Sequence, residues 1–267
     1  MDFNLTEWLN LVLRWIHVFA GILWIGQTYF FTWLDGRFGE LPGKEEEGND
    51  RVWMVHSGGF YAVTKQRIPK LMPATLHWFR WEAAITWLTG VSLLALVYYY
   101  GGLMVDETMD EATALLVGVG VLLLAWPVYE AVWRSPLGRD ERVGAGVSFL
   151  LIVAASYGLT QWMGGRAAYI HVGAMFGTIM AANVWLTILP AQRKMVASLK
   201  ASKGPDLHLA QRAKTCSKHN TFLAIPLVLI MISNHFPTAT YGTTMNWLVL
   251  SVLVLIGWGA AKIVRRG

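Results

Sequence analysis

The sequence predicts an all-α membrane protein, a polytopic bundle of about seven transmembrane helices that forms one integral-membrane domain over residues 1–267. Hydrophobic residues make up 55% of the chain and charged residues 15%, and the apolar residues gather in runs close to the length that crosses a bilayer as a helix. The basic residues gather between these runs, as in the cytoplasmic loops of membrane proteins. We therefore expect the lipid bilayer to surround this chain, and we read its net charge of +5 as a topology signal rather than a sign of nucleic-acid binding.

The apolar runs give the expected spans in chain order. The first run follows an acidic N-terminus, MDFNLTEWLN, and has no small-residue cleavage site, so it is predicted to remain as a helix rather than be removed as a signal peptide. The predicted spans are residues 8–33, 80–100, 113–133, 146–163, 167–190, 220–236 and 246–264.

The distribution of Lys and Arg predicts the orientation. With the N-terminus outside and the C-terminus inside, all Lys and Arg residues except Arg14 and Arg166 lie in or at the edge of cytoplasmic segments. Those segments are the loops 34–79, 134–145 and 191–218 and the tail from Lys262.

The chain shows no separate soluble domain, and we expect no cytochrome c domain in it. Its longest loop, 34–79, begins with a Gly- and Glu-rich stretch typical of an exposed linker. The second half of that loop alternates aromatic and basic residues around a Ser57-Gly58-Gly59 turn, and is predicted to pack on the inner membrane face. The single cysteine, Cys216, excludes an internal disulfide and a CxxCH haem attachment, and is expected to be a bystander in the basic loop.

A polar stripe runs along the first predicted span. Its members are three or four residues apart, which places them on one helix face: Arg14, His17, Gly21, Trp24 and Thr28. Ionisable groups inside spans are costly and usually functional. An axial imidazole, a small residue one turn away and a cation nearer the surface are what a flat macrocycle needs, so the stripe predicts a haem b with His17 as a ligand.

A second axial ligand has to come from another helix at comparable depth. His171 lies five residues after Arg166 and ranks first, and His235, at the end of the sixth span, ranks second. The alternative for each of these histidines is a structural role, in which the imidazole bonds to a neighbouring carbonyl or hydroxyl group.

A second polar cluster is expected near the inner surface. His77 and Arg80 are predicted to share a helical face, Glu82 points elsewhere, and His219, Asn220 and His56 lie at similar depth. Arg and His donors together with an amide can bind a planar anion, and the set could also hold a second haem. The alternative is that these groups reach headgroups and water at the interface.

Three other polar residues have simpler expected roles. Glu130 precedes Arg134 by four residues and is predicted to pair with it. Asn183 is expected to form hydrogen bonds between helices, and His208 in the basic loop is expected to have no functional role.

Five segments, spread over nearly the whole chain, carry a recognisable pattern: HVFAGILWIGQTYF, WMVHSGGFYAVTK, LHWFRWEAAITWLTG, GRAAYIHVGAMFGTIMAANVWLTILPAQ and SKHNTFLAIPLVLIMISNH. They resemble the bacterial membrane-bound urate hydroxylases, also called the urate oxidase N-terminal domain family.

The resemblance implies a multi-pass protein of the bacterial inner membrane that hydroxylates urate to 5-hydroxyisourate. Family members typically carry an eighth helix and a periplasmic cytochrome c domain, and we expect both to be missing from this chain. Two functions stay open. In the first, urate or a related purine is oxidised at the inner cluster, and electrons pass through haem b to a separate cytochrome c or respiratory complex. In the second, the chain is a non-catalytic haem b or structural subunit of a larger electron-transfer complex.

Overall fold

The computed structural model describes residues 4–41, 51–66, 75–106, 109–204 and 206–265. Within these ranges seven helical segments are long and apolar enough to cross a membrane, so the predicted number of spans is confirmed by length and composition. The Gly- and Glu-rich stretch 42–50 lies outside the described residues.

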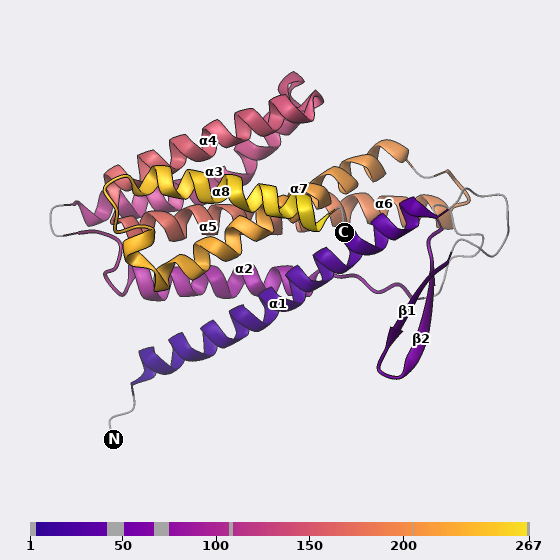
Figure 1. The fold of residues 1–267 in the computed structure, drawn as a ribbon, viewed down its shortest axis with the longest axis horizontal. Coiled ribbons are helices and arrows are strands. Elements are labelled where there is room, and N and C mark those ends of the chain that lie inside the picture. Colours follow the sequence, from indigo (N-terminus) through magenta and orange to yellow (C-terminus); the bar gives the residue numbers. More distant parts are fainter. Residues whose placement is uncertain (1–3, 42–50, 67–74, 107–108, 205, 266–267) are drawn as a thin grey trace.

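The helices follow one another up and down along the long axis of the molecule (Figure 1). Two of the seven segments contain a π-helical stretch, one at the end of the second segment and one inside the fifth.

 The fifth segment continues as a helix beyond its π-helical stretch and counts as one span, and the second segment ends with its π-helical stretch. The elements are α1 (Leu5–Glu40), β1 (Arg51–His56), β2 (Gly59–Thr64), α2 (Trp81–Leu94) with η1 (Ala95–Tyr99), α3 (Glu111–Arg134), η2 (Pro136–Arg139), α4 (Glu141–Trp162), α5 (Gly165–Ala182) with η3 (Asn183–Ile188) and α6 (Leu189–Lys200), α7 (Leu207–Ile232), η4 (Ser233–His235), η5 (Pro237–Ala239) and α8 (Asn246–Val264).

Several helices extend well beyond the apolar runs. The segment from α5 to α6 reaches Lys200 and α7 begins at Leu207, so most of the predicted loop 191–218 is helical. Helical hydrogen bonding does not stop where the hydrocarbon ends, and Ala, Gln, Lys and Arg in this region are good helix formers. Cys216 is therefore buried within α7, and its predicted place in a loop was wrong.

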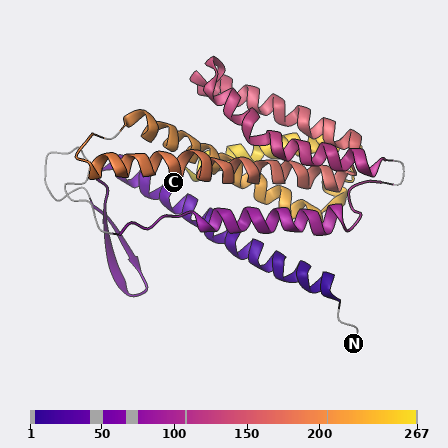
Figure 2. The same cartoon turned by 180° about the vertical axis from the view of Figure 1, so that it is seen from behind.

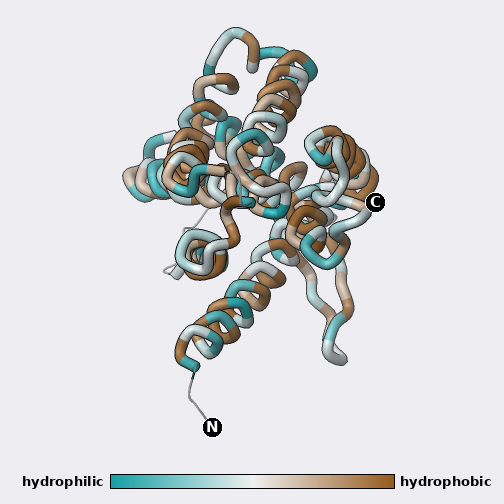
Figure 3. The backbone as a smooth tube through the Cα atoms, turned by 90° about the vertical axis from the view of Figure 1, so that its left-hand side faces the viewer, coloured by the Kyte–Doolittle hydropathy of each residue, from teal (hydrophilic) through white to brown (hydrophobic). Residues whose placement is uncertain are grey.

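Helix α5 forms the centre of the bundle. Most of its residues are buried, and it packs against α2, α3, α4 and α7 (Figures 1 and 2). Helix α1 packs along α2, but its N-terminal part stands apart from the other helices (Figure 3). Apolar side chains such as Trp15, which is 71% exposed, suit contact with lipid at this place.

The predicted loop 34–79 contains a β-hairpin, which the all-α prediction did not include. Strands β1 and β2 pair antiparallel, and Ser57 and Gly58 form the turn with positive φ angles of 50° and 75°. The β-branched and aromatic residues on both sides of this turn favour strands. Lys65 Nζ lies 2.5 Å from Asp35 Oδ1, which joins the hairpin to the end of α1.

The hairpin projects from the end of the bundle where α1 terminates (Figures 1 and 2). Its exposed apolar side chains include Trp53, Val55 and Phe60, the last of them 82% exposed. An exposed apolar surface of this kind is consistent with the predicted packing on the membrane, which stays a prediction.

Candidate functional sites

His17 lies in the interface between α1 and α2. Its Nδ1 is 2.9 Å from the carbonyl oxygen of Thr86 and 3.2 Å from the hydroxyl of Thr89. A methyl group on Gly90 would come within 2.9 Å of the His17 ring, so glycine is needed at position 90 for this close approach. With Nδ1–H donated to a carbonyl, Nε2 carries the lone pair, and it makes no hydrogen bond within the described chain.

The other members of the predicted stripe have different surroundings. A methyl group on Gly21 would lie 3.8 Å from the Thr86 methyl group, so Gly21 faces α2, and Trp24 is buried. Arg14 is exposed and donates to Asn10, and Thr28 donates to the carbonyl of Trp24. His17 and Gly21 of the stripe face α2, and Arg14 lies at its exposed end.

His171 is completely buried in a second interface, formed by α5, α3 and η1. Its Nδ1 is 2.8 Å from the carbonyl of Ala167, and its Nε2 is 3.0 Å from the hydroxyl of Tyr99. A methyl group on Gly118 would come within 2.7 Å of Nε2, so α3 also closes on this ring. The sequence did not predict this contact of Tyr99. Tyr99 therefore bonds to Nε2, the ring nitrogen that a metal would need.

His17 suits an axial haem ligand better than His171 does. A ligating histidine usually donates its second ring nitrogen to a carbonyl, and both histidines have this arrangement. Of these two histidines, however, only His17 has an unbonded Nε2 within the described chain. The two rings lie in separate helix interfaces. His17 has a ring nitrogen free to bind a metal, whereas both ring nitrogens of His171 are bonded, and the His17–His171 ligand pair stays a prediction.

His235 lies at the end of η4 and is exposed. The residue before it, Asn234, accepts a hydrogen bond from Arg166 at 3.1 Å. The third histidine proposed as a ligand is thus at the surface of the bundle. His56, which contacts Ser57, and His208, near the start of α7, are also exposed.

Arg80 caps the start of α2, which begins at Trp81, so His77 and Arg80 precede the helix and do not share a helical face. The Arg80 guanidinium lies 5.4 Å from the Trp81 ring centroid, and Trp81 crosses Trp185 of η3 at 5.9 Å. Arg80 Nε and Trp185 Nε1 are both buried without a hydrogen-bond partner in the described structure. His77 is exposed, with its ring 4.5 Å from that of Phe79.

Glu82 extends toward α1, where its Oε1 accepts a hydrogen bond of 3.2 Å from Gln27 Nε2. The start of α2 thus carries donors on the side of η3 and a carboxylate on the side of α1. Gln27 and Trp185 were missed in the sequence, although Gln27 is a polar residue in an apolar run, three positions after Trp24.

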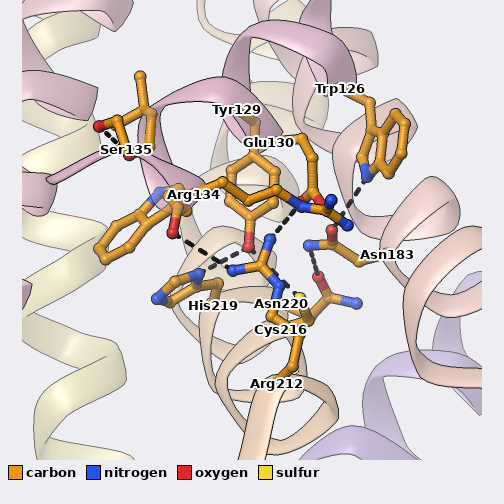
Figure 4. Close-up of polar contacts among 12 residues, drawn as sticks. Trp126, Tyr129, Glu130, Arg134, Ser135, Asn183, Arg212, Cys216, His219 and Asn220 are labelled. Carbon is orange, nitrogen blue, oxygen red and sulfur yellow. Dashed lines mark hydrogen bonds and ion pairs between the residues drawn. The ribbon is translucent and has the colours of Figure 1, made fainter. Parts of the chain in front are cut away.

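The remaining inner polar residues form a separate group between α3, η3 and α7 (Figure 4). Glu130 pairs with Arg134 at 2.5 Å, which confirms that prediction, and also with Arg212 of α7. The sequence did not predict the pair of Glu130 and Arg212, because the two residues are far apart along the chain.

Asn183 and Asn220 bond to each other in the same group. Asn183 Nδ2 donates to Asn220 Oδ1 at 3.0 Å and Asn183 Oδ1 accepts from Trp126, while Asn220 Nδ2 donates to the Met180 carbonyl (Figure 4). The prediction that Asn183 forms hydrogen bonds between helices is confirmed. Asn220 has the same structural role.

His219 packs between Tyr129 and Trp133 of α3. Its Nδ1 is 2.6 Å from the Tyr129 hydroxyl, and its ring centroid is 4.0 Å from that of Trp133 (Figure 4). No described hydrogen bond joins His219 or Asn220 to His77, Arg80 or Glu82. The predicted inner cluster is therefore two groups, one at the start of α2 and one between α3 and α7.

The fold and these contacts define a multi-pass membrane-type helical protein with polar groups held between its helices. The chain belongs to the urate oxidase N-terminal family, whose model matches residues 3–265. No curated protein and no solved structure matches the chain.

Proposed function

We propose that this chain is an oxidoreductase of the urate hydroxylase type in the bacterial inner membrane, and that it oxidises urate or a related purine. The observation that carries the proposal is the pair of unpartnered donors Arg80 Nε at the start of α2 and Trp185 Nε1 on η3, in a chain that matches the urate oxidase N-terminal family over residues 3–265. A buried donor without a partner is costly, and a ligand that brings acceptors relieves that cost.

A urate anion has the acceptors that these donors lack. It is flat, negatively charged at neutral pH, and has carbonyl oxygens on its edges. Arg80 provides positive charge and a planar set of N–H donors, and Trp185 provides one further N–H. The rings of Trp81 and Trp185 offer aromatic surface beside the guanidinium.

Glu82 is the carboxylate that we assign as general base. Hydroxylation by water adds one oxygen atom to the purine and releases two protons and two electrons. Glu82 would accept a proton from the attacking water, and Gln27, which donates to Glu82, would orient the carboxylate. His77, at the exposed edge of the same group, is placed to exchange protons with solvent.

We propose that His17, through Nε2, would hold a haem b at the α1–α2 interface. The haem would supply one-electron chemistry between the purine and a separate cytochrome c or respiratory complex. The residues of the chain hold the His17 ring in one tautomer through the Thr86 carbonyl.

The test is urate-dependent reduction of an added cytochrome c by membranes that contain the protein. Arg80→Gln should raise KM at least tenfold, because a charge-assisted hydrogen bond contributes about 1.5–3 kcal/mol. Glu82→Gln should lower kcat, since the amide still accepts from Gln27 but cannot accept a proton. Arg193→Gln, at an exposed position of α6, is the matched control and should leave both constants unchanged.

Absence of any reduction, with haem present and the protein folded, would favour the alternative in which the chain is a non-catalytic subunit. Reduction that is unaffected by both Arg80→Gln and Glu82→Gln would support the enzyme and move its substrate site elsewhere.

A further inference from the structure

A cavity of about 850 Å³ lies between α3, α4, α5, α7 and α8, away from the start of α2. Its volume is within the range of pockets that hold small organic ligands. Aliphatic and aromatic side chains form most of its wall, among them Val128, Leu151, Ile152, Phe176 and Phe222.

The polar groups of the cavity are gathered at one end. Tyr129 and Trp133 near the end of α3, Glu141 at the start of α4 and His219 on α7 all line it there. Lys218 pairs with Glu141 at 2.6 Å beside them. The opposite end of the cavity, toward the middle of the spans, is lined by apolar residues, so the space suits a molecule with a polar head and an apolar body.

Two N–H donors in this cavity have no partner in the described structure. The Trp258 indole nitrogen is buried without a hydrogen bond. On His219, Nδ1 is 2.6 Å from the Tyr129 hydroxyl and Nε2 makes no described hydrogen bond; in the tautomer in which Tyr129 donates to Nδ1, Nε2 carries the proton. The head of the ligand should therefore offer two acceptors.

We infer that this cavity binds a membrane quinone. A quinone head is a flat, uncharged ring with carbonyl oxygens on opposite edges, and such oxygens accept hydrogen bonds from N–H groups like those of His219 and Trp258. The Trp133 ring beside His219 gives the head an aromatic neighbour, and the apolar walls accommodate the first part of the tail. A single acyl chain would satisfy neither donor, and a carboxylate head would compete with Glu141 for Lys218.

This inference rests on the proposed function in one respect: the quinone would accept the electrons that the proposed oxidation of the purine releases. The purine and one water molecule give the hydroxylated purine, two electrons and two protons, and the quinone takes up two electrons and two protons to become a quinol. The overall reaction is then balanced without an additional oxidant.

The binding itself is tested without any purine. Decylubiquinone is titrated into the purified protein and its dissociation constant is measured by calorimetry. Gly259→Leu should raise the constant about tenfold or more, because Gly259 lines the cavity and a side chain there meets no atom within 4 Å. Trp258→Phe should raise it several-fold, since it keeps the ring and removes the N–H.

The matched controls are Gly158→Leu, where a side chain also meets no atom within 4 Å, and Trp247→Phe on the same helix as Trp258. Neither residue lines the cavity, and both variants should bind like the unaltered protein. No saturable binding, or equal losses in the controls, would overturn the inference. Displacement of decylubiquinone by palmitate or phosphatidylglycerol at equal concentration would also overturn it, in favour of a lipid site.

The two proposals fail separately. Quinone binding without urate oxidation would contradict the proposed function and leave the cavity assignment in place. Urate-dependent reduction of cytochrome c in a protein that binds no quinone would support the proposed function and contradict the cavity assignment.

Discussion

Glu130 on α3 forms an ion pair with Arg212 on α7 between the helices, and both side chains are largely shielded from solvent, at 11% and 18% exposed. Arg134, the second partner of the same carboxylate, is 70% exposed. One carboxylate thus pairs with a shielded cation and with an exposed cation. The contributions of a shielded and an exposed ion pair to stability can therefore be compared at the same carboxylate.

Arg212→Met and Arg134→Met should therefore differ strongly in stability. Removal of one partner of a buried ion pair costs about 3–5 kcal/mol, because the remaining charge stays buried, whereas an exposed pair contributes about 0–1 kcal/mol. Thermal unfolding of the two purified variants in the same detergent measures the difference. Equal losses of stability would show that Arg134 is as important as Arg212.

Trp185 provides a more specific test of the substrate site than Arg80 does. Trp185→Phe keeps the edge contact with Trp81 and removes only the unpartnered N–H. We expect a several-fold higher KM for urate with little change in thermal stability. Trp87→Phe is the control, because the Trp87 N–H is already bonded to Thr178 at 3.0 Å. A larger effect of the control on KM would contradict the placement of urate beside Trp185.

The haem proposal makes different predictions for two intramembrane histidines. His17→Ala should lose most of the haem b, measured as pyridine haemochrome per protein, because it removes the unbonded Nε2. His171→Ala should keep its haem, because His171 Nε2 is bonded to Tyr99. Full haem content in His17→Ala would show that this ligand is assigned to the wrong residue.

The orientation is open to a direct measurement. A reporter that is active only in the cytoplasm, fused after Gly267, should be active, and the same reporter in the segment between η1 and α3 should be inactive. The opposite pattern would reverse the orientation predicted from Lys and Arg.

Asp110 gives a prediction that depends on pH. It caps α3, and its Oδ2 accepts from the Thr113 backbone N–H at 2.8 Å and from the Thr113 hydroxyl. These hydrogen bonds, with the side chain of Thr113 as the largest cause, lower the pKa of Asp110 below its ordinary value. A lowered pKa in the folded state means that the ionised carboxylate stabilises the cap at neutral pH and that this contribution is lost as the pH falls below about 4.

Asp110→Ala should accordingly increase hydrogen exchange in the first turn of α3 at pH 7, and the difference from the unaltered protein should shrink in acid. A difference that is independent of pH would show that the charge of Asp110 is unimportant for the cap.

The sequence by itself determined the number of spans, because apolar runs of bilayer length are a local property of the chain. It also determined the Glu130–Arg134 pair, which lies within one helical turn, and the residues of α1 that share one face. Local spacing cannot show which helices become neighbours, so Arg212 and Tyr99 were found only in the tertiary structure. For the same reason, the inner polar residues divide between the start of α2 and the α3–α7 interface. The sequence predicts how far each residue lies from the end of its span, whereas helix packing decides which other helix it faces.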